Sequence, residues 1–269
     1  MSRKLHKFQT VAEYQAYSAS TDYTTPCVAV VEENNVIYYD YGNNMPHLNY
    51  TDYKVSSRSL VSDGGDTYGL GETLCSNYIP SGVTSLEDAF SYWSSLEEVT
   101  CEIPDGVTSM YSTFLGCSSL VTAPEIPSGV TDMRGTFQGC SRLVNVPEIP
   151  SGFTSMSSTF RDCSSLVNAP EIPSGVTIMV STFYNCTNLV TAPKIPSGVT
   201  NMSYTFNGCS SLKEVTFLRT TPPRYNNTLY GCSKLETIYV PDSAVSAYKT
   251  ATGWSQFASK IKPLSEKAK

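Results

Sequence analysis

Charge is scarce in this sequence, and positive charge is scarcest. Charged residues make up 16% of the 269 positions, whereas an average globular chain has about 25%. The 18 Lys and Arg residues are outnumbered by 24 Asp and Glu residues, so the formal net charge is −6. Binding to a nucleic acid needs a dense basic surface that displaces counterions from the phosphates. We therefore expect no nucleic-acid partner.

Long hydrophobic runs are also absent. No apolar stretch approaches the ~20 residues that a membrane-spanning helix needs, so we expect no membrane insertion. The basic start Met1–Lys7 is not followed by an apolar segment, which argues against a secretory signal peptide. With 17 glycines and 16 prolines, the composition is ordinary enough to exclude a collagen-like or low-complexity chain.

The residues that most often perform catalysis or bind metals are few and scattered. The two histidines, His6 and His47, lie in no pattern typical of a catalytic triad. Cysteines never occur at the Cys-x-x-Cys spacing of a zinc site. The glycine-rich segment Gly64–Gly71 lacks the Lys-Ser/Thr pair of a phosphate-binding loop. The sequence thus predicts no catalytic residues, no metal and no cofactor, and hence a protein that is not an enzyme.

Repetition is what the sequence has in abundance. The motif Ile-Pro-Ser-Gly-Val-Thr-x-Met-x-x-Thr-Phe-x-x-Cys-x-x-Leu returns every 23 residues. Three of its positions show the interval: Met110, Met133, Met156, Met179 and Met202; Phe114, Phe137, Phe160, Phe183 and Phe206; Cys117, Cys140, Cys163, Cys186, Cys209 and Cys232. Such a period indicates a solenoid in which each repeat is one rung that stacks on the next. With a weaker copy at Ile79–Trp93, we expect about seven rungs. The interval from Phe90 to Phe114 is 24, so an extra residue is expected to bulge near Thr100–Cys101.

One rung can be interpreted residue by residue. Its apolar positions are expected to point inward and to stack on their equivalents; they are Val130, Met133, Phe137, Cys140, Leu143, Val146 and Ile149. The three-residue spacing from Phe137 to Leu143 fits a 3₁₀ or helical turn. Short parallel strands are predicted at Val130–Met133 and Leu143–Val146. The second should end before Pro147, because proline cannot donate to a strand ladder.

The six cysteines spaced by 23 residues allow three interpretations. Equivalent Cα atoms of neighbouring rungs lie near the distance that a disulfide bridges, and thiolates also bind metals. However, each of these cysteines follows an inward aromatic or leucine by three residues and precedes an inward leucine by three. A column of small, buried and reduced thiols explains this pattern best.

The repeat motif resembles the BspA-type leucine-rich repeat of gut and oral bacteria. The end of the chain strengthens this resemblance, because four segments are similar to the terminal repeat and cap of that family: Thr221–Pro223, Gly231–Pro241, Ala247–Lys249 and Gly253–Ser255. The resemblance covers about residues 79–264. It implies a leucine-rich-repeat solenoid that serves adhesion or binding.

The N-terminal end departs from the repeat. Residues 1–45 are expected to form a small α+β segment, with a short helix over Val11–Ser18 and a hairpin of Val28–Val31 with Val36–Tyr39. This segment resembles N-terminal pieces of virion proteins from phages that infect gut Bacteroidales, which implies a docking role. Residues 46–78 are interpreted as a junction and residues 79–241 as the solenoid.

Residues 242–269 are interpreted as a C-terminal cap and tail. An open solenoid end exposes apolar residues and unpaired strand edges, so a terminal cap is needed. Asp242 or Ser243 is expected to cap a short helix. Trp254, Phe257 and Ile261 are expected to cover the last rung.

Candidate binding residues are those that vary between invariant positions. Two such columns cross the predicted turn: Tyr111, Arg134, Ser157, Val180 and Ser203-Tyr204 after methionine, and Leu115, Gln138, Arg161, Tyr184 and Asn207 after phenylalanine. Tyr and Arg are enriched at binding hot spots, which favours Tyr111, Arg134, Arg161, Tyr184 and Tyr204. A polar column on the strand, with Asn145 and Asn168 between Thr122 and Thr191, is the rival surface. Neutral variation of a solvated face would also explain the columns.

These expectations describe a non-enzymatic binding or adhesion protein. Residues 1–45 would dock to other virion proteins, and the solenoid would contact a protein or glycan of the host surface. The chain would then be located on a phage virion, as a tail, fibre or capsid-decoration component. The alternative is a BspA-like adhesin of the bacterial cell surface that binds host proteins or glycans.

Overall fold

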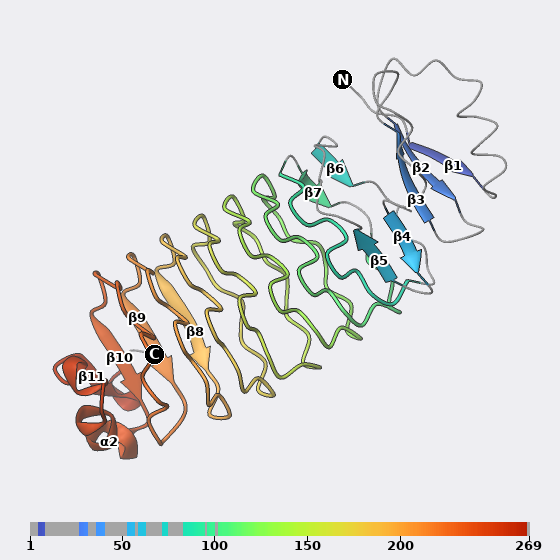
Figure 1. The fold of residues 1–269 in the computed structure, drawn as a ribbon. Coiled ribbons are helices and arrows are strands. Elements are labelled where there is room, and N and C mark those ends of the chain that lie inside the picture. Colours follow the sequence, from blue (N-terminus) through green and yellow to red (C-terminus); the bar gives the residue numbers. More distant parts are fainter. Residues whose placement is uncertain are drawn as a thin grey trace.

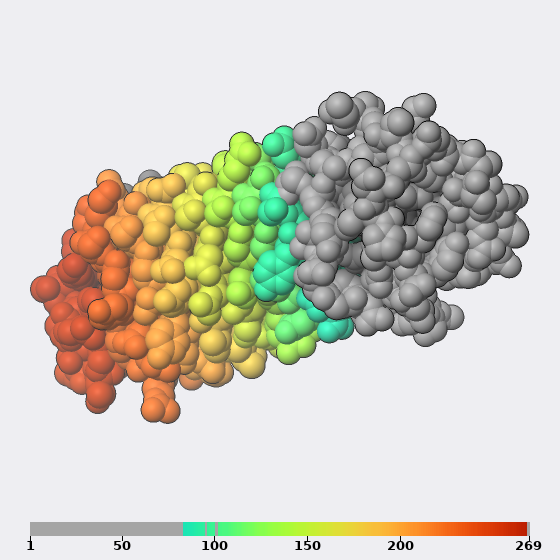
Figure 2. Space-filling view, turned by 45° about the horizontal axis from the view of Figure 1, so that its top comes forward, coloured from blue at the N-terminus to red at the C-terminus, as the bar shows by residue number. Residues whose placement is uncertain are grey.

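The solenoid is the best-described part of the chain. The computed structural model describes residues 83–94, 96–99 and 102–267, together with the backbone of six short strands before them. The described rungs stack into one elongated body, with successive rungs side by side from teal to red (Figures 1 and 2). In the described part of the chain, no helix has the length and apolar character to cross a membrane.

The six N-terminal strands pair in three groups. β1 (Leu5–Phe8) lies parallel to β2 (Cys27–Val31), which pairs antiparallel with β3 (Val36–Asp40). This β2–β3 pair has the register of the hairpin that the sequence predicts, whereas the expected helix over Val11–Ser18 lies outside the described residues. β4 (Tyr53–Ser56) and β5 (Ser59–Ser62) are antiparallel. β6 (Glu72–Leu74) is parallel to β7 (Leu96–Val99), the pairing that the rungs continue.

The segment from methionine to leucine of each rung is a chain of three-residue turns. In the rung of Phe137, the N–H of Cys140 donates to the Phe137 carbonyl over 3.1 Å and that of Leu143 to the Cys140 carbonyl over 3.0 Å. Alternate residues donate instead to the following rung: Phe137 N bonds to the Thr159 carbonyl over 2.9 Å and Gly139 N to the Arg161 carbonyl over 2.7 Å. The predicted 3₁₀-type turn is therefore confirmed. It does not form a helix, because every second N–H bonds to a neighbouring rung.

The parallel strands of the middle rungs are reduced to single bridges. Neighbouring rungs share two, as in Ser109↔Asp132 before methionine and Thr122↔Asn145 after leucine, but among the described residues no bridge joins the rungs of Met133 and Met156. Four longer strands form a parallel sheet at the C-terminal end, in the order β11 (Ile261–Pro263), β10 (Thr237–Val240), β9 (Glu214–Phe217), β8 (Thr191–Ile195).

One prediction about these strands is wrong. β8 continues through Pro193, although we expected each strand to end before its proline. The pairing of β8 with β9 shifts register between Thr191 and Lys194. Pro193 lies at this irregular point, where the regular ladder is interrupted and the missing N–H of proline is tolerated.

The core consists of columns of identical side chains. In the rung of Phe137, six of the seven predicted inward residues are buried and only Val146 is partly exposed. The rings of Phe90, Phe114, Phe137, Phe160, Phe183 and Phe206 stack in one column with centroids 5.5–5.8 Å apart. Each rung thus buries its apolar face against the rungs on both sides, as a solenoid requires.

Buried polar groups of the core bond between rungs. Fully buried threonines form a column, in which the Thr136 hydroxyl donates to the Met110 carbonyl over 2.7 Å and the Thr159 hydroxyl to the Met133 carbonyl over 3.0 Å. The six column cysteines are free and buried, as predicted. Their Sγ atoms donate to the phenylalanine carbonyls of the preceding rung, as from Cys163 to Phe137 over 3.1 Å. These bonds satisfy polar atoms that would otherwise be costly to bury.

The spacing between rungs changes from 24 to 23 residues after β7. The N–H of Val121 bonds to the Glu97 carbonyl, 24 positions earlier, whereas the N–H of Thr131 bonds to the Thr108 carbonyl, 23 positions earlier. The extra residue therefore lies between Glu97 and Thr108. The position that we expected for it, Thr100–Cys101, falls in this interval but lies outside the described residues.

The C-terminal segment folds over the last rungs. After η2 (Asp242–Ala244), α2 (Val245–Thr250) and η3 (Ser255–Phe257), the chain adds β11 to the sheet and ends with η4 (Leu264–Glu266). Trp254 is fully buried, with its ring 5.1 Å from that of Phe217. Phe257 is only partly buried. The predicted helix cap is wrong, because no side chain caps η2 or α2 and Asp242 Oδ1 accepts the Ser265 N–H over 3.0 Å.

Candidate functional site

Two surfaces of the solenoid carry the candidate residues. We call the exposed surface of the segments between the methionine and cysteine positions of each rung, which includes the two variable columns, the turn face. We call the surface of the residues one and two positions after each inward leucine the strand face. The structure places Tyr111, Arg134, Arg161, Tyr184 and Tyr204 on the turn face, and Asn145 and Asn168 on the strand face. The turn that links the column cysteines to the leucines separates the two faces.

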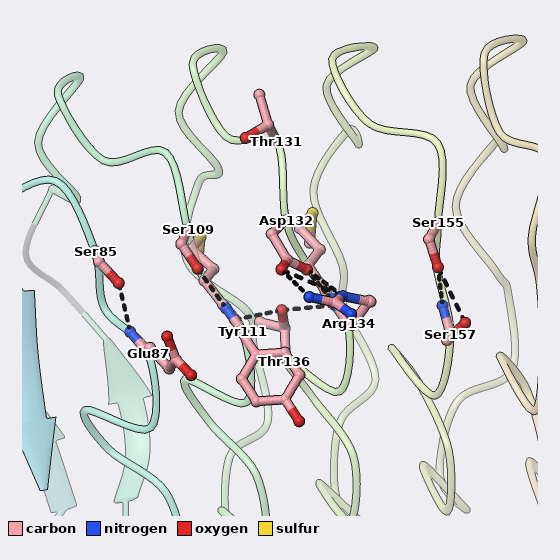
Figure 3. A network of polar contacts seen from close by, with 12 residues as sticks. Ser85, Glu87, Ser109, Tyr111, Thr131, Asp132, Arg134, Thr136, Ser155 and Ser157 are labelled. Atoms are coloured by element: carbon pink, nitrogen blue, oxygen red, sulfur yellow. Dashed lines mark hydrogen bonds and ion pairs between the residues drawn. The ribbon is translucent and has the colours of Figure 1, made fainter.

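Arg134 and Tyr111 pack against each other across two rungs. The guanidinium carbon of Arg134 lies 5.2 Å from the centroid of the Tyr111 ring. Asp132, in the same rung as Arg134, holds the guanidinium through its Nη2 at 2.6 Å and its Nε at 3.0 Å (Figure 3). The fork-like contact restricts Arg134 to one orientation, so that its flat face covers the tyrosine ring.

A polar residue before the methionine orients the turn face in four rungs, those of Ser109, Asp132, Ser155 and Asn201. The side chain of Ser109 accepts the Tyr111 N–H over 3.4 Å, and Asp132 Oδ1 accepts the Arg134 N–H over 3.1 Å (Figure 3). Ser155 makes the equivalent bond to Ser157 N. Short polar side chains readily bond to a backbone N–H two residues ahead. This position thus fixes where the following variable residue points.

A second arginine–tyrosine pair lies in the column after phenylalanine. The guanidinium carbon of Arg161 lies 4.6 Å from the centroid of the Tyr184 ring. Asp162 contacts Arg161 Nε at 3.2 Å through one carboxylate oxygen and accepts the Asn185 amide over 3.0 Å through the other. The structure therefore brings the sequence-predicted residues together as two stacked pairs, each with an aspartate beside the arginine.

The charge of Asp132 depends on its arginine. Partial burial disfavours the ionised carboxylate, but the hydrogen bonds and charge of Arg134 outweigh burial, so the pKa of Asp132 lies below its ordinary value. Asp132 consequently stays ionised at neutral pH. The pair with Arg134 is then present well into the acidic range.

Tyr204 does not lie in the same column as Tyr111, contrary to its grouping in the sequence. Its backbone has φ 60°, and it lies in the left-handed column with Ser112, Ser158 and Ser181. The ring is nevertheless 38% exposed on the turn face. Left-handed backbone is uncommon for a residue with a large side chain, which marks this position as strained.

Sequence analysis missed two tyrosines of the turn face. Tyr92 and Tyr230 are the most exposed large aromatic residues of the described rungs, at 56% and 67%. The Tyr92 ring lies over Gly116 of the next rung, where a Cβ atom would come 2.8 Å from the ring. Tyr230 directly follows Leu229, which takes the place of phenylalanine in its rung. The repeat alone therefore assigns Tyr230 to the variable column after phenylalanine.

Neither face offers a metal centre. Within residues 83–94, 96–99 and 102–267, no three His, Cys, Asp or Glu side chains gather closely enough to hold a metal ion. Burial, the largest effect, raises the pKa of the Cys232 thiol to about 12 and those of the other five column thiols as well. At neutral pH these thiols are therefore protonated, which is the unreactive form.

The repeat and its geometry define a leucine-rich-repeat solenoid. The model of the BspA type leucine rich repeat region matches residues 71–190 and 176–256 with six copies. The chain therefore belongs to the BspA-type leucine-rich repeat family. The matched residues agree closely with the segment, about 79–264, over which the sequence shows the resemblance.

Of two similar solved structures, the first supports the fold. A leucine-rich repeat protein of T. pallidum is similar at 22% identity and a TM-score of 0.50, over 76% of this chain and 94% of that one. A leucine rich cell surface protein of Faecalibacterium prausnitzii has 23% identity and a TM-score of 0.33, over 68% of this chain and 64% of that one. No curated protein matches the chain.

Proposed function

We propose that this protein is a non-enzymatic adhesion protein that binds a partner protein through its turn face. The observation that carries the proposal is the pair of arginine–tyrosine stacks, Arg134 on Tyr111 and Arg161 on Tyr184. Arg and Tyr dominate the energetics of protein interfaces, especially where their rotamers are already ordered before binding. Asp132 and Asp162 provide this order.

A protein partner fits these stacks better than a glycan does. Sugar rings bind by lying flat on open aromatic faces, but one face of Tyr111 and one face of Tyr184 are covered by guanidinium groups. The outward edges of Arg134 and Arg161 still have N–H donors for carboxylates or carbonyls of a partner. Tyr92 and Tyr230 extend the surface toward both ends of the solenoid.

The carrier of the solenoid is a separate part of the proposal. We predict a phage virion, since residues 1–45 resemble virion proteins, with the bacterial cell surface as the alternative. Mass spectrometry of purified virions and of cell envelopes distinguishes the two carriers. Deletion of residues 1–45 should leave the solenoid folded and abolish incorporation into particles. Incorporation of the truncated chain would contradict the docking role.

Binding by the turn face can be tested with cells. Fluorescently labelled protein would be added to gut bacteria and to intestinal epithelial cells. To the cells that bind the parent protein, the double variant Arg161→Ala/Tyr184→Ala should bind at least tenfold more weakly. Arg142→Ala is the matched control, since Arg142 is an exposed arginine outside the turn face. Binding that survives periodate but not protease treatment of the cells supports a protein partner. Equal binding by the double variant would refute the proposal.

A further inference from the structure

The strand face has a stripe of four valines between opposite charges, in which the two central valines are exposed and the two outer ones are partly buried. The residues one position after the inward leucines form it, in the order Glu97, Val121, Val144, Val167, Val190 and Lys213. Val144 is 42% exposed and Val167 40%, which places both among the most exposed large apolar residues of the described rungs. Scattered apolar residues need no explanation, but a continuous apolar stripe marks an interaction surface.

The neighbouring column has the same symmetry. Two positions after the leucines lie Thr122, Asn145, Asn168 and Thr191, an order that reads identically from either end. The valine stripe also reads identically in both directions, apart from its ends, where Glu97 and Lys213 have opposite charge. A two-fold axis between the rungs of Val144 and Val167 would therefore place each of these residues opposite a like or a complementary residue of the second copy.

Backbone hydrogen bonds join neighbouring rungs on both sides of this axis, whereas among the described residues no bond of this kind joins Val167 to Val144 across it. The Val144 N–H bonds to the Val121 carbonyl over 2.9 Å, the Val190 N–H to the Val167 carbonyl over 3.3 Å, and the Lys213 N–H to the Val190 carbonyl over 2.9 Å. Bonds of this kind hold rungs about 4.8 Å apart. Two copies of the face therefore match in rung spacing on each side of the axis.

We propose that the strand face binds a second copy of this chain in an antiparallel arrangement. Val144 then packs against the partner's Val167, Asn145 bonds to the partner's Asn168, and Glu97 pairs with the partner's Lys213. Every contact occurs twice, because such an interface is isologous, and the assembly closes at two subunits.

Charge along the solenoid favours this orientation. In the described rungs, residues 83–133 contain 8 Asp and Glu and no Lys or Arg, a net charge of −8, whereas residues 134–267 contain 7 acidic and 12 basic residues, a net charge of +5. Antiparallel association brings the acidic half of each copy beside the basic half of the other. Parallel association would bring like charges together, which costs free energy.

Two local charge contacts are compatible with this arrangement. Arg142 approaches Glu97 within its own chain at 3.8 Å, but both side chains are more than half exposed, and an exposed pair of this kind contributes little. Glu97 thus stays available to the partner's Lys213. Glu98 would face the partner's Glu214, whose carboxylate is already neutralised by Lys267 Nζ at 2.8 Å.

The first test measures the mass of the full chain in solution over a range of concentrations, by sedimentation or light scattering. A reversible dimer is expected for the parent. Val167→Lys should give a monomer, because it places a charge at the centre of the apolar stripe. Ile178→Lys is the matched control, since Ile178 is 37% exposed but lies in the other bridge column, and it should remain dimeric. A parent that is monomeric at about 100 µM, or a dimer that survives Val167→Lys, overturns the proposal.

The second test examines the register. Glu97→Lys and Lys213→Glu should each weaken dimerisation by tenfold or more, whereas the combined exchange restores it. A carbodiimide joins only carboxylates and amines in direct contact, and Glu97 and Lys213 of one chain are five rungs, about 24 Å, apart. A Glu97–Lys213 crosslink in the dimer must therefore connect two chains. Failure of the combined exchange to restore the dimer, with no such crosslink, excludes this register.

Discussion

Three invariant inward residues of each rung have three different roles. In the rung of Phe160, the phenyl ring stacks between those of Phe137 and Phe183, Thr159 donates its hydroxyl to the Met133 carbonyl, and Cys163 donates its thiol to the Phe137 carbonyl. Only the ring is purely apolar. The other two bury a polar atom and supply it with a partner in the preceding rung, so that a single substitution affects two rungs.

The Phe160→Ala variant tests the aromatic column. We expect a loss of about 3–5 kcal/mol in the free energy of unfolding, because the fully buried ring leaves a cavity between two rigid neighbours. Phe160→Leu, which fills more of that cavity, should lose less. Urea unfolding followed by circular dichroism measures both. A Phe160→Ala variant as stable as the parent would contradict the inward position of the ring.

The Thr159→Val variant tests the threonine column. The shape of the side chain is conserved, but the bond to the Met133 carbonyl is lost in a fully buried place, which should cost about 1–2 kcal/mol. Thr131 makes a similar bond to the Thr108 carbonyl on the surface, where water can replace it. Thr131→Val should therefore change the stability by less than about 0.5 kcal/mol. Equal losses in the two variants would mean that burial does not decide the cost.

The repeat made most inward residues predictable, since a residue type that returns every 23 positions stacks on its equivalents in the neighbouring rungs. It did not reveal the bonds between rungs. The hydroxyl of Thr136 could have pointed to solvent as well as to the Met110 carbonyl, and periodicity does not distinguish the two. Likewise, the stacking of Arg134 on Tyr111 depends on Asp132, which the sequence placed only within the predicted strand Val130–Met133. The left-handed column before each cysteine was readable, since Gly139, Asp162 and Asn185 all tolerate that backbone.

At the scale of elements, the C-terminal segment differs from the rungs in how it is held. A rung has neighbours on two sides, whereas this segment contacts the solenoid on one side only. A cluster of aromatic rings takes the place of the missing neighbour. The centroid of the Trp254 ring lies 5.1 Å from that of Phe217, 5.2 Å from that of Tyr248 and 5.5 Å from that of Tyr225, and all three contacts are edge to face. The indole N–H also donates to the Pro223 carbonyl over 2.7 Å.

Trp254→Ala should loosen this segment and expose the last rung. We expect a loss of about 3–5 kcal/mol, since a fully buried ring is removed. Hydrogen exchange should show that protection is lost in residues 237–267 before it is lost in the middle rungs. Trp254→Phe retains ring contacts but not the bond to Pro223, and its loss should be smaller. Uniform deprotection of the whole solenoid would show that the segment does not unfold separately.

At the scale of the whole molecule, the six buried thiols make stability depend on pH. Burial raises the pKa of each above the ordinary value of 9.0, to about 12 for Cys232. Between these values the unfolded chain loses its thiol protons and the folded chain retains them. Stability is therefore complete below pH 9 and falls as the pH rises.

The size of this effect predicts alkaline unfolding. Above pH 9, each thiol lowers the free energy of unfolding by about 1.4 kcal/mol per pH unit, and the six together lower it by about 8 kcal/mol per pH unit. A change of this size over one pH unit is comparable with the whole stability of a typical domain. We expect cooperative unfolding between about pH 10 and 11, followed by circular dichroism at 25 °C. Replacement of Cys140, Cys163 and Cys186 by alanine should halve the slope of stability against pH. An unchanged slope in that variant would assign the pH dependence to other groups.

The bonding of each rung to its neighbours bears on how the gene can change. Because the hydroxyl of Thr159 and the thiol of Cys163 find their acceptors one rung earlier, an added rung brings both its own donors and the acceptors for the next. Recombination between near-identical coding repeats inserts or deletes whole rungs without loss of reading frame. Each event would alter the reach of the solenoid by about 4.8 Å. A rung with Val and Asn inserted between Val144 and Val167 would lengthen the strand face and retain its two-fold pattern. Two chains with different numbers of rungs would then no longer pair in register. A new length variant would therefore associate with copies of itself.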